Sequence, residues 1–139
     1  MSDEPIDLVL NKIKIDEKRS EQIIILKEKD GSRYLPVVIG IAEVNAIKLK
    51  LSGIEPPRPL THDLLLKIIE TFGAKLKQVL INRLENSTFY AKLIISRNGD
   101  GEDLSIDARP SDSIALALRA NAPIAASRSV LDEAGIREI

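Results

Sequence analysis

The sequence predicts an α+β fold: one compact domain over residues 1–139, with a mixed, largely antiparallel sheet and three to four helices packed against it. The length suits a single domain with a substantial core. Short apolar or alternating runs, separated by turn signals such as Asp30-Gly31, indicate hairpins. Apolar residues at helical spacing, followed by glycine or proline, indicate helices between the strands.

The first part of the chain predicts three strands. Residues 6–15 alternate with one change of phase, which a bulge near Asn11-Lys12 would explain. Residues 22–27 and 34–39 are joined by the Asp30-Gly31 turn and form the second and third strands.

Two helices should follow. The first carries Ile41, Val44, Ile47 and Leu51 at helical spacing and ends at Gly53. Three prolines make residues 54–59 a stiff, extended connector. We expect the second helix to begin at Thr61 as its N-cap and to end at Gly73. Its expected buried stripe consists of Leu64, Leu65, Ile68, Ile69 and Phe72.

Three more strands are expected at residues 78–85, 88–96 and 104–107, with turns at 86–87 and 98–101. A third helix should start with Ser111 as its N-cap and run to about Asn121, before Pro123. Residues 123–126 read as a short extended piece, and a last short helix over 130–134 should be capped by Ser129.

Composition excludes several classes of protein. The chain has no cysteine and one histidine, which excludes disulfides, cysteine-ligated metals and a histidine-rich metal site within one subunit. A net charge of −1 and a pI near 5.9 do not indicate a nucleic-acid-binding surface. No apolar run approaches the roughly 20 residues that span a bilayer. The N-terminus lacks a signal-peptide core, so we expect a cytoplasmic protein with no membrane association.

Two similar Arg-Pro segments carry the candidate chemistry: residues 58–63 and 109–112, the second preceded by Asp107. Each places an arginine, a hydroxyl and an acid at the expected start of a helix, where backbone N–H groups favour anions. Arginine can bind phosphate bidentately, and His62 can act as an acid or base near neutral pH. The carboxylates Glu43, Asp63, Asp107 and Asp112 could hold a hard cation such as magnesium. Such a set suits phosphodiester hydrolysis.

A purely structural interpretation stays open for each of these residues. Asp63 precedes Lys67 by four residues, a favourable pair on a helix surface. Asp112 in a first helical turn complements the helix dipole without any catalytic role. Arg109 could simply tie Asp107 to the loop.

Four motifs, with Glu43 just after the first, resemble the bifunctional nuclease domain family, named for activity on DNA and RNA. They are LPVVIG at residues 35–40, PRPLTHDLL at 57–65, TFYA at 88–91 and DARPSDSIALA at 107–117. The resemblance covers nearly the whole chain. It implies a compact α+β domain that forms a homo-oligomer, with a dimer favoured.

The resemblance also implies a nuclease without strong sequence preference for DNA or RNA. Its motif positions make His62, Asp63, Asp107 and Asp112 candidate catalytic residues. Candidate substrate-binding residues are Arg58, Thr61, Arg109 and Ser111. Candidate ligands for Mg²⁺ or Mn²⁺ are Asp107, Asp112 and Glu43.

Two other functions stay open. The chain could be a non-catalytic oligomeric module that binds protein or nucleic acid, with the Arg-Pro segments purely structural. It could also hold a small anion, such as a nucleotide, at a helix N-terminus.

Overall fold

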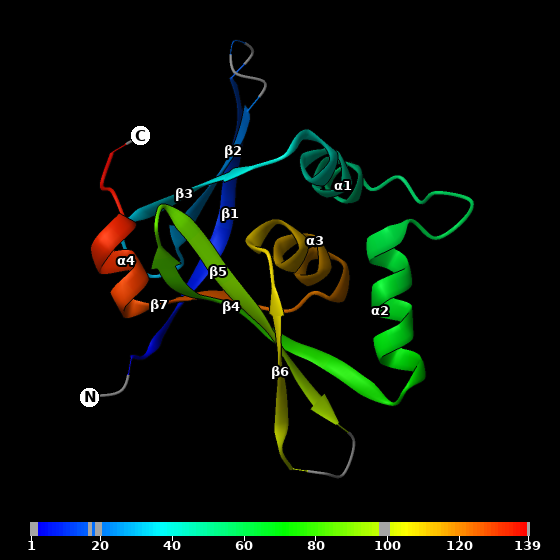
Figure 1. Ribbon diagram of the computed structural model, residues 1–139. Coiled ribbons are helices and arrows are strands. Elements are labelled where there is room, and N and C mark those ends of the chain that lie inside the picture. The colour runs from blue at the N-terminus through cyan, green and yellow to red at the C-terminus, as the bar shows by residue number, and fades with distance from the viewer. Residues whose placement is uncertain (1–2, 17, 19–20, 98–100, 139) are drawn as a thin grey trace.

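In the computed structural model of the protein, residues 3–16, 18, 21–97 and 101–138 are described, and Figure 1 shows their arrangement. The elements are β1 (Pro5–Asp16), β2 (Glu21–Glu28), β3 (Tyr34–Ile39), α1 (Ile41–Leu51), α2 (Thr61–Thr71), β4 (Ala74–Glu85), β5 (Thr88–Arg97), β6 (Asp103–Ala108), α3 (Pro110–Ala120), β7 (Ile124–Ser127) and α4 (Arg128–Ala134). The predicted α+β class is confirmed.

The predicted hairpins are confirmed in their pairing. β1, β2 and β3 pair antiparallel in succession, and the register of β1 against β2 shifts between Leu10 and Lys12, where the bulge was expected. Asn86 and Ser87 link β4 to β5 with φ of 52° and 61°, the left-handed values that a tight hairpin turn requires. β5 pairs antiparallel with β6. Residues 98–100 of the predicted turn between them lie outside the described part of the chain.

The described strands form one sheet in the order β3-β2-β1-β7-β4-β5-β6. β7 lies in the middle, antiparallel to β1 and parallel to β4, so it joins two antiparallel units. Its four residues are all buried, because both faces of the sheet are covered there. The sequence predicted only a short extended piece here, and the structure makes it the central strand.

Figure 1 shows α1, α2 and α3 on one side of the strands and α4 on the other. α3 contacts both α1 and α2 as well as β4 and β5, and it is the most buried helix. Its apolar residues join those of the strands in one hydrophobic cluster that includes Ile114, Leu116, Val79 and Leu93. The position of α3 therefore fixes where its own N-terminus meets α1 and α2.

The predicted buried stripe of α2 is confirmed only at Ile69, which packs against the core, and is wrong at its other four residues. Leu64, Leu65 and Ile68 are exposed, and Phe72 at the helix end is 84% exposed. The inward side of α2 carries His62, Leu66 and Ile69. Since apolar residues surround this helix, their spacing alone could not select the inward face. The exposed stripe Leu64, Leu65, Ile68 and Phe72 is called the α2 stripe below. Within the described residues, no helix is long and apolar enough to cross a membrane.

Candidate functional site

The N-terminus of α3 is set by Arg109 and Pro110. Arg109 is the N-cap, in extended conformation, and Pro110 is the first helical residue, where its fixed φ fits and a missing N–H costs nothing. The predicted N-cap, Ser111, is therefore wrong by two positions. The Arg109 carbonyl accepts hydrogen bonds from the backbone N–H and the hydroxyl of Ser113, at 3.0 and 2.9 Å. Asp112 becomes the third helical residue.

α2 begins in a similar way. Its N-cap is Leu60, also extended, so the prediction that Thr61 caps this helix is wrong by one residue. Asp63 is the third helical residue, and its Oδ2 accepts a hydrogen bond from the Leu60 N–H at 3.0 Å. The same local arrangement thus places one aspartate in the first turn of each helix, where the positive end of the helix dipole favours a carboxylate.

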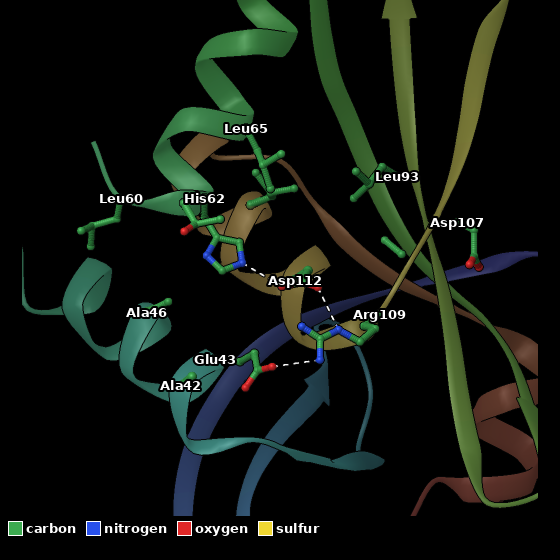
Figure 2. Close-up of a pocket in the computed structure, with 13 residues that line it drawn as sticks. Ala42, Glu43, Ala46, Leu60, His62, Leu65, Leu93, Asp107, Arg109 and Asp112 are labelled. Atoms are coloured by element: carbon green, nitrogen blue, oxygen red, sulfur yellow. Dashed lines mark hydrogen bonds and ion pairs between the residues drawn. The ribbon is translucent and has the colours of Figure 1, made fainter. Parts of the chain in front are cut away.

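The two Arg-Pro segments meet through a chain of polar contacts, which Figure 2 shows. His62 Nε2 lies 2.9 Å from Asp112 Oδ1, although the residues are 50 positions apart. Arg109 Nε donates to Asp112 Oδ2 at 3.0 Å, and Arg109 Nη1 lies 2.9 Å from Glu43 Oε1. The chain Glu43–Arg109–Asp112–His62 therefore links α1, the start of α3 and the start of α2.

Asp112 is held as a carboxylate. Its partial burial raises its pKa, but hydrogen bonds from His62 and Arg109 outweigh burial, and the pKa falls below its ordinary value of 3.8. The hydrogen bond to Asp112, followed by the charges of Asp112 and Glu43, raises the pKa of Arg109.

The ionised Asp112 determines the tautomer of His62. A carboxylate only accepts hydrogen bonds, so Nε2 of His62 must carry the proton that it shares with Asp112. In the neutral ring, Nδ1 then has a free lone pair, and it has no hydrogen-bond partner within the described part of the chain. A histidine oriented in this way can accept a proton, and the resulting imidazolium would be stabilised by Asp112.

These groups line a pocket of about 590 Å³ between α1, α2, the start of α3 and the strands β5 and β6. Its polar wall is formed by Glu43, Thr61, His62, Arg109 and Asp112. Its apolar wall is formed by Ala42, Ala46, Leu60, Leu65, Leu93 and Leu116. The Arg109 side chain is 66% exposed, so its guanidinium is accessible to a ligand. Ser111 lies instead in a separate hollow beside β3.

Asp107 does not join this cluster. In the β5–β6 pairing, Ile106 lies opposite Leu93 and Asp107 lies opposite Lys92. Because Leu93 faces the pocket, the alternation of the strand turns the Asp107 carboxylate to the other face of the sheet. Figure 2 shows Asp107 across the strands from Asp112, with no contact drawn between them, although the residue borders the pocket.

The other acid and the other arginine of the predicted site also lie apart. Asp63 Oδ1 accepts a hydrogen bond from Arg119 Nε at 2.7 Å, so the predicted pairing of Asp63 with Lys67 is not the one that forms. Arg58 lines a second pocket, between the proline-containing connector and α2. Neither side chain contacts His62 or Asp112 through a hydrogen bond or ion pair in the described residues.

The three candidate metal ligands are not assembled. Glu43 and Asp112 both pair with Arg109, while the strand register places Asp107 on the opposite face of the sheet. Among the residues that the structure describes, no three His, Cys, Asp or Glu side chains gather closely enough to hold a metal ion. Dependence on Mg²⁺ or Mn²⁺ stays a prediction.

Sequence reasoning missed Arg119, whose side chain is only 4% exposed. Besides Asp63, it donates to the backbone carbonyls of Ala115 and Ala46, at 3.0 and 3.1 Å, and so joins α3 to α1 and α2. The only sequence signal was spacing, since Asp112, Leu116 and Arg119 lie on one face of a helix.

Comparison with known proteins identifies the family. A family model described as the bifunctional nuclease domain matches residues 24–138. The chain belongs to the bifunctional nuclease domain family. Within this family it is 45% identical over 124 residues to an uncharacterized protein of Mycobacterium tuberculosis, covering 89% of this chain and 73% of that protein.

Two plant relatives carry a functional name. The chain is 29% identical over 127 residues to Bifunctional nuclease 2 of Oryza sativa subsp. japonica, covering 90% of this chain and 39% of the rice protein. It is 28% identical over 119 residues to Bifunctional nuclease 2 of Arabidopsis thaliana, covering 84% and 36%. This chain therefore spans less than half of each plant protein, and activities of the whole plant proteins come to it only as proposals.

Proposed function

We propose that this protein hydrolyses phosphodiester bonds in DNA and RNA without strong sequence preference, at the pocket formed by His62, Asp112 and Arg109. The observation that carries the proposal is the orientation of His62, with Nε2 bonded to an ionised carboxylate and Nδ1 free. The family, and relatives named Bifunctional nuclease, support a substrate that contains phosphodiester bonds.

Each residue of the polar chain has a distinct part in the proposed reaction. Nδ1 of His62 takes a proton from a water molecule, whose oxygen bonds to phosphorus while the bond from phosphorus to the leaving sugar oxygen breaks. The leaving oxygen takes a proton from solvent, and His62 later returns its own proton to solvent. Asp112 keeps the imidazole ring oriented and stabilises its charged form.

Arg109 is the group that would bind the phosphate. Its Nε and Nη1 are held by Asp112 and Glu43, while Nη2 has no partner among the described residues. The guanidinium is thus fixed in direction but still has N–H groups free to donate to a phosphate oxygen. Its charge would also stabilise the negative charge that develops on the phosphate during attack.

The proposal is tested by cleavage of single-stranded RNA and DNA with purified protein, in magnesium, in manganese and in EDTA. The key variant is His62→Gln, whose side-chain amide can still donate to Asp112 but cannot accept a proton as imidazole does. We expect cleavage to fall by about 100-fold or more, the usual effect of losing a general base. Glu70→Gln, on the outer surface of α2, is the matched control and should cleave like the wild type.

Equal cleavage by the wild type and His62→Gln would contradict the proposal, because it would indicate a contaminating nuclease or another site. Cleavage that persists in EDTA would remove the predicted need for a divalent cation. The three metal conditions therefore separate the cation prediction from the histidine mechanism.

A second candidate function is a homo-oligomeric binding module, with a dimer favoured. The observation in its favour is the α2 stripe, Leu64, Leu65, Ile68 and Phe72, which is exposed in the single chain. Exposed apolar surface of this kind is typical of association sites. Sedimentation velocity tests the association directly, and a single monomeric species at all concentrations would contradict it.

A further inference from the structure

A second pocket, of about 730 Å³, lies beside the one that contains His62. It is formed by the end of α1, the proline-containing connector and the outer side of the α2 start. Its charged lining residues are Lys50, Glu55, Arg58, Asp63, Lys67 and Arg119, four cations against two carboxylates. A cationic pocket is notable in a chain whose net charge is −1.

The charge of Asp63 is already neutralised by Arg119. Arg119 Nε donates to Asp63 Oδ1 at 2.7 Å, and the Leu60 N–H donates to Oδ2 at 3.0 Å. Burial raises the pKa of Asp63, but these hydrogen bonds outweigh it, and the pKa is lowered, so the pair is ionised at neutral pH. Three cations, Lys50, Arg58 and Lys67, then face one carboxylate, Glu55.

Arg58 and Lys67 are free for a ligand, whereas the charge of Lys50 also acts on Asp63 and helps to lower the pKa of that carboxyl. Lys67 would pair with Asp63 along α2, but Asp63 is bonded to Arg119 instead. In the part of the chain that the structure describes, the ion pair and hydrogen bonds of this pocket join Asp63 to Arg119 and to Leu60, and none forms at Lys50, Arg58 or Lys67. Lys50 also complements the C-terminal end of the α1 dipole, but this does not explain Arg58 or Lys67.

Arg58 is held where it can meet an anion. It lies between Pro57 and Pro59, whose rings fix two neighbouring φ angles and restrict the backbone of Arg58 itself. Less backbone entropy is therefore lost when a ligand orders this segment. An arginine with two nearby lysines is a combination that suits phosphate oxygens.

The two pockets share the first turn of α2 as a wall. Leu60, Thr61 and His62 line the first pocket, whereas Asp63 and Leu64 line the second. A nucleic acid strand with one phosphate at His62 and Arg109 could pass over this turn and place a neighbouring part of its backbone in the second pocket. The shared wall is tied to its neighbours, because Arg119 of α3 donates hydrogen bonds to α2 and α1 as well as within its own helix.

We propose that the pocket of Lys50, Arg58 and Lys67 is a second phosphate-binding site that holds single-stranded nucleic acid beside the bond to be cleaved. The inference rests on the proposed nuclease function and extends it, since it makes the preferred substrate a chain of several nucleotides rather than a dinucleotide. It gives Arg58 a place in substrate binding that is separate from the His62 pocket.

The test is equilibrium binding of a fluorescein-labelled 12-nucleotide single strand, measured by anisotropy over a range of salt concentrations. The His62→Gln background in EDTA prevents cleavage during the measurement. The triple variant Lys50→Gln, Arg58→Gln and Lys67→Gln is compared with the parent. All three side chains are exposed, so their replacement should not unfold the protein.

For each phosphate that the protein no longer binds, the plot of log affinity against log salt should become shallower by about 0.7. We expect the plot for the triple variant to be shallower by the equivalent of about one to two phosphates. Its affinity at low salt should be at least about 10-fold weaker. The matched control replaces Lys12, Lys14 and Lys29, which are exposed on β1 and after β2, by glutamine. It removes the same charge elsewhere and should keep most of the parent's slope and affinity.

An equal effect of the two triple variants would overturn the inference, because net charge alone would then account for the binding. The inference would also be overturned if the parent binds the strand and the triple variant of Lys50, Arg58 and Lys67 shows the same slope of log affinity against log salt. A mononucleotide or inorganic phosphate that displaces the strand at micromolar concentration would show a small-anion site instead, and would also overturn it. None of these outcomes affects the proposed function, which the cleavage assay on the wild type decides separately.

Discussion

Replacing Arg119 by methionine should destabilise the protein by about 3–4 kcal/mol, the lower part of the range for breaking a buried ion pair by removing one partner. Methionine keeps much of the side-chain volume, so the change removes the guanidinium without opening a large cavity. Three hydrogen bonds disappear: the bond to Asp63 Oδ1 at 2.7 Å and those to the Ala115 and Ala46 carbonyls at 3.0 and 3.1 Å.

The hydrogen bonds of Arg119 and the exposure of their acceptors determine how large the destabilisation should be. A hydrogen bond to a charged group contributes about 1.5–3 kcal/mol to stability. The side chain of Asp63 is 31% exposed and keeps its bond from the Leu60 N–H, so water can partly replace the guanidinium. The Ala46 and Ala115 carbonyls lie inside helices, where a carbonyl also accepts a hydrogen bond from the helix backbone. Loss of Arg119 therefore does not leave these two carbonyls without a donor. The destabilisation should therefore stay below the sum of three full bonds.

The assay is urea denaturation followed by circular dichroism. With an m value of about 2 kcal/mol per molar, typical of a small domain, the midpoint should fall by about 1.5–2 M at unchanged m. The matched control is Arg128→Met, which removes an exposed arginine that lies 3.9 Å from Glu4 and should change stability by less than about 0.5 kcal/mol. A midpoint shift for Arg119→Met no larger than that of the control would refute the reasoning that Arg119 fastens the three helices.

Further predictions concern the pocket, acid stability and the α2 stripe. Asp112→Asn should lower the cleavage rate by about 100-fold or more, because the tautomer of the histidine is lost, while Asp107→Asn should keep it within a few-fold; single-turnover rates measure both. The folded-state pKa values of Asp112 and Asp63 lie below the unfolded value of about 3.9, so their contribution to stability should persist through neutral pH and fall away only below about pH 4. Melting temperatures from pH 7 to pH 3 should fall less steeply below pH 4 for Asp112→Asn than for the wild type, and parallel curves would contradict this. Ile68→Ser with Phe72→Ser should shift any oligomer toward monomer in sedimentation velocity without lowering the melting temperature of the monomer, since both side chains are exposed in the single chain.

Local signals account for the parts of the fold that the sequence predicted. The bulge near Asn11 and Lys12, the turn at Asn86-Ser87 and the strand over 34–39 each depend on residues that are adjacent or nearly so. Turn chemistry and alternation act over such distances, and the structure contains all three features.

The parts that the sequence could not predict depend on contacts between distant segments. β7 is four residues long and buried on both faces, so it has no alternation, and only its pairing with β1 and β4 makes it a strand. The inward face of α2 is selected by α3 and β4, since apolar residues occupy most sides of this helix. His62 and Asp112 were candidates because both lie at helix starts, but their pairing across 50 residues follows from how α2 and α3 pack.

The two Arg-Pro segments show how one local pattern can serve two purposes. In each, the third helical residue is an aspartate that lies at the positive end of a helix dipole. Asp63 meets Arg119, which is buried and has no other carboxylate partner in the described residues, so its charge is used to hold three helices together. Asp112 meets His62 and an exposed Arg109 in an open pocket, so its charge orients groups that a ligand can reach.

We therefore expect a structural role for Asp63, while the catalytic proposal rests on Asp112. The difference lies in the exposure of the partner arginine, 4% for Arg119 and 66% for Arg109. If that reasoning is right, Asp63→Asn should lower stability more than Asp112→Asn does, and Asp112→Asn should lower cleavage far more than Asp63→Asn does when both are assayed well below their melting temperatures. Variants that lose stability and activity in the same proportion would show that the two Arg-Pro segments do not differ in this way.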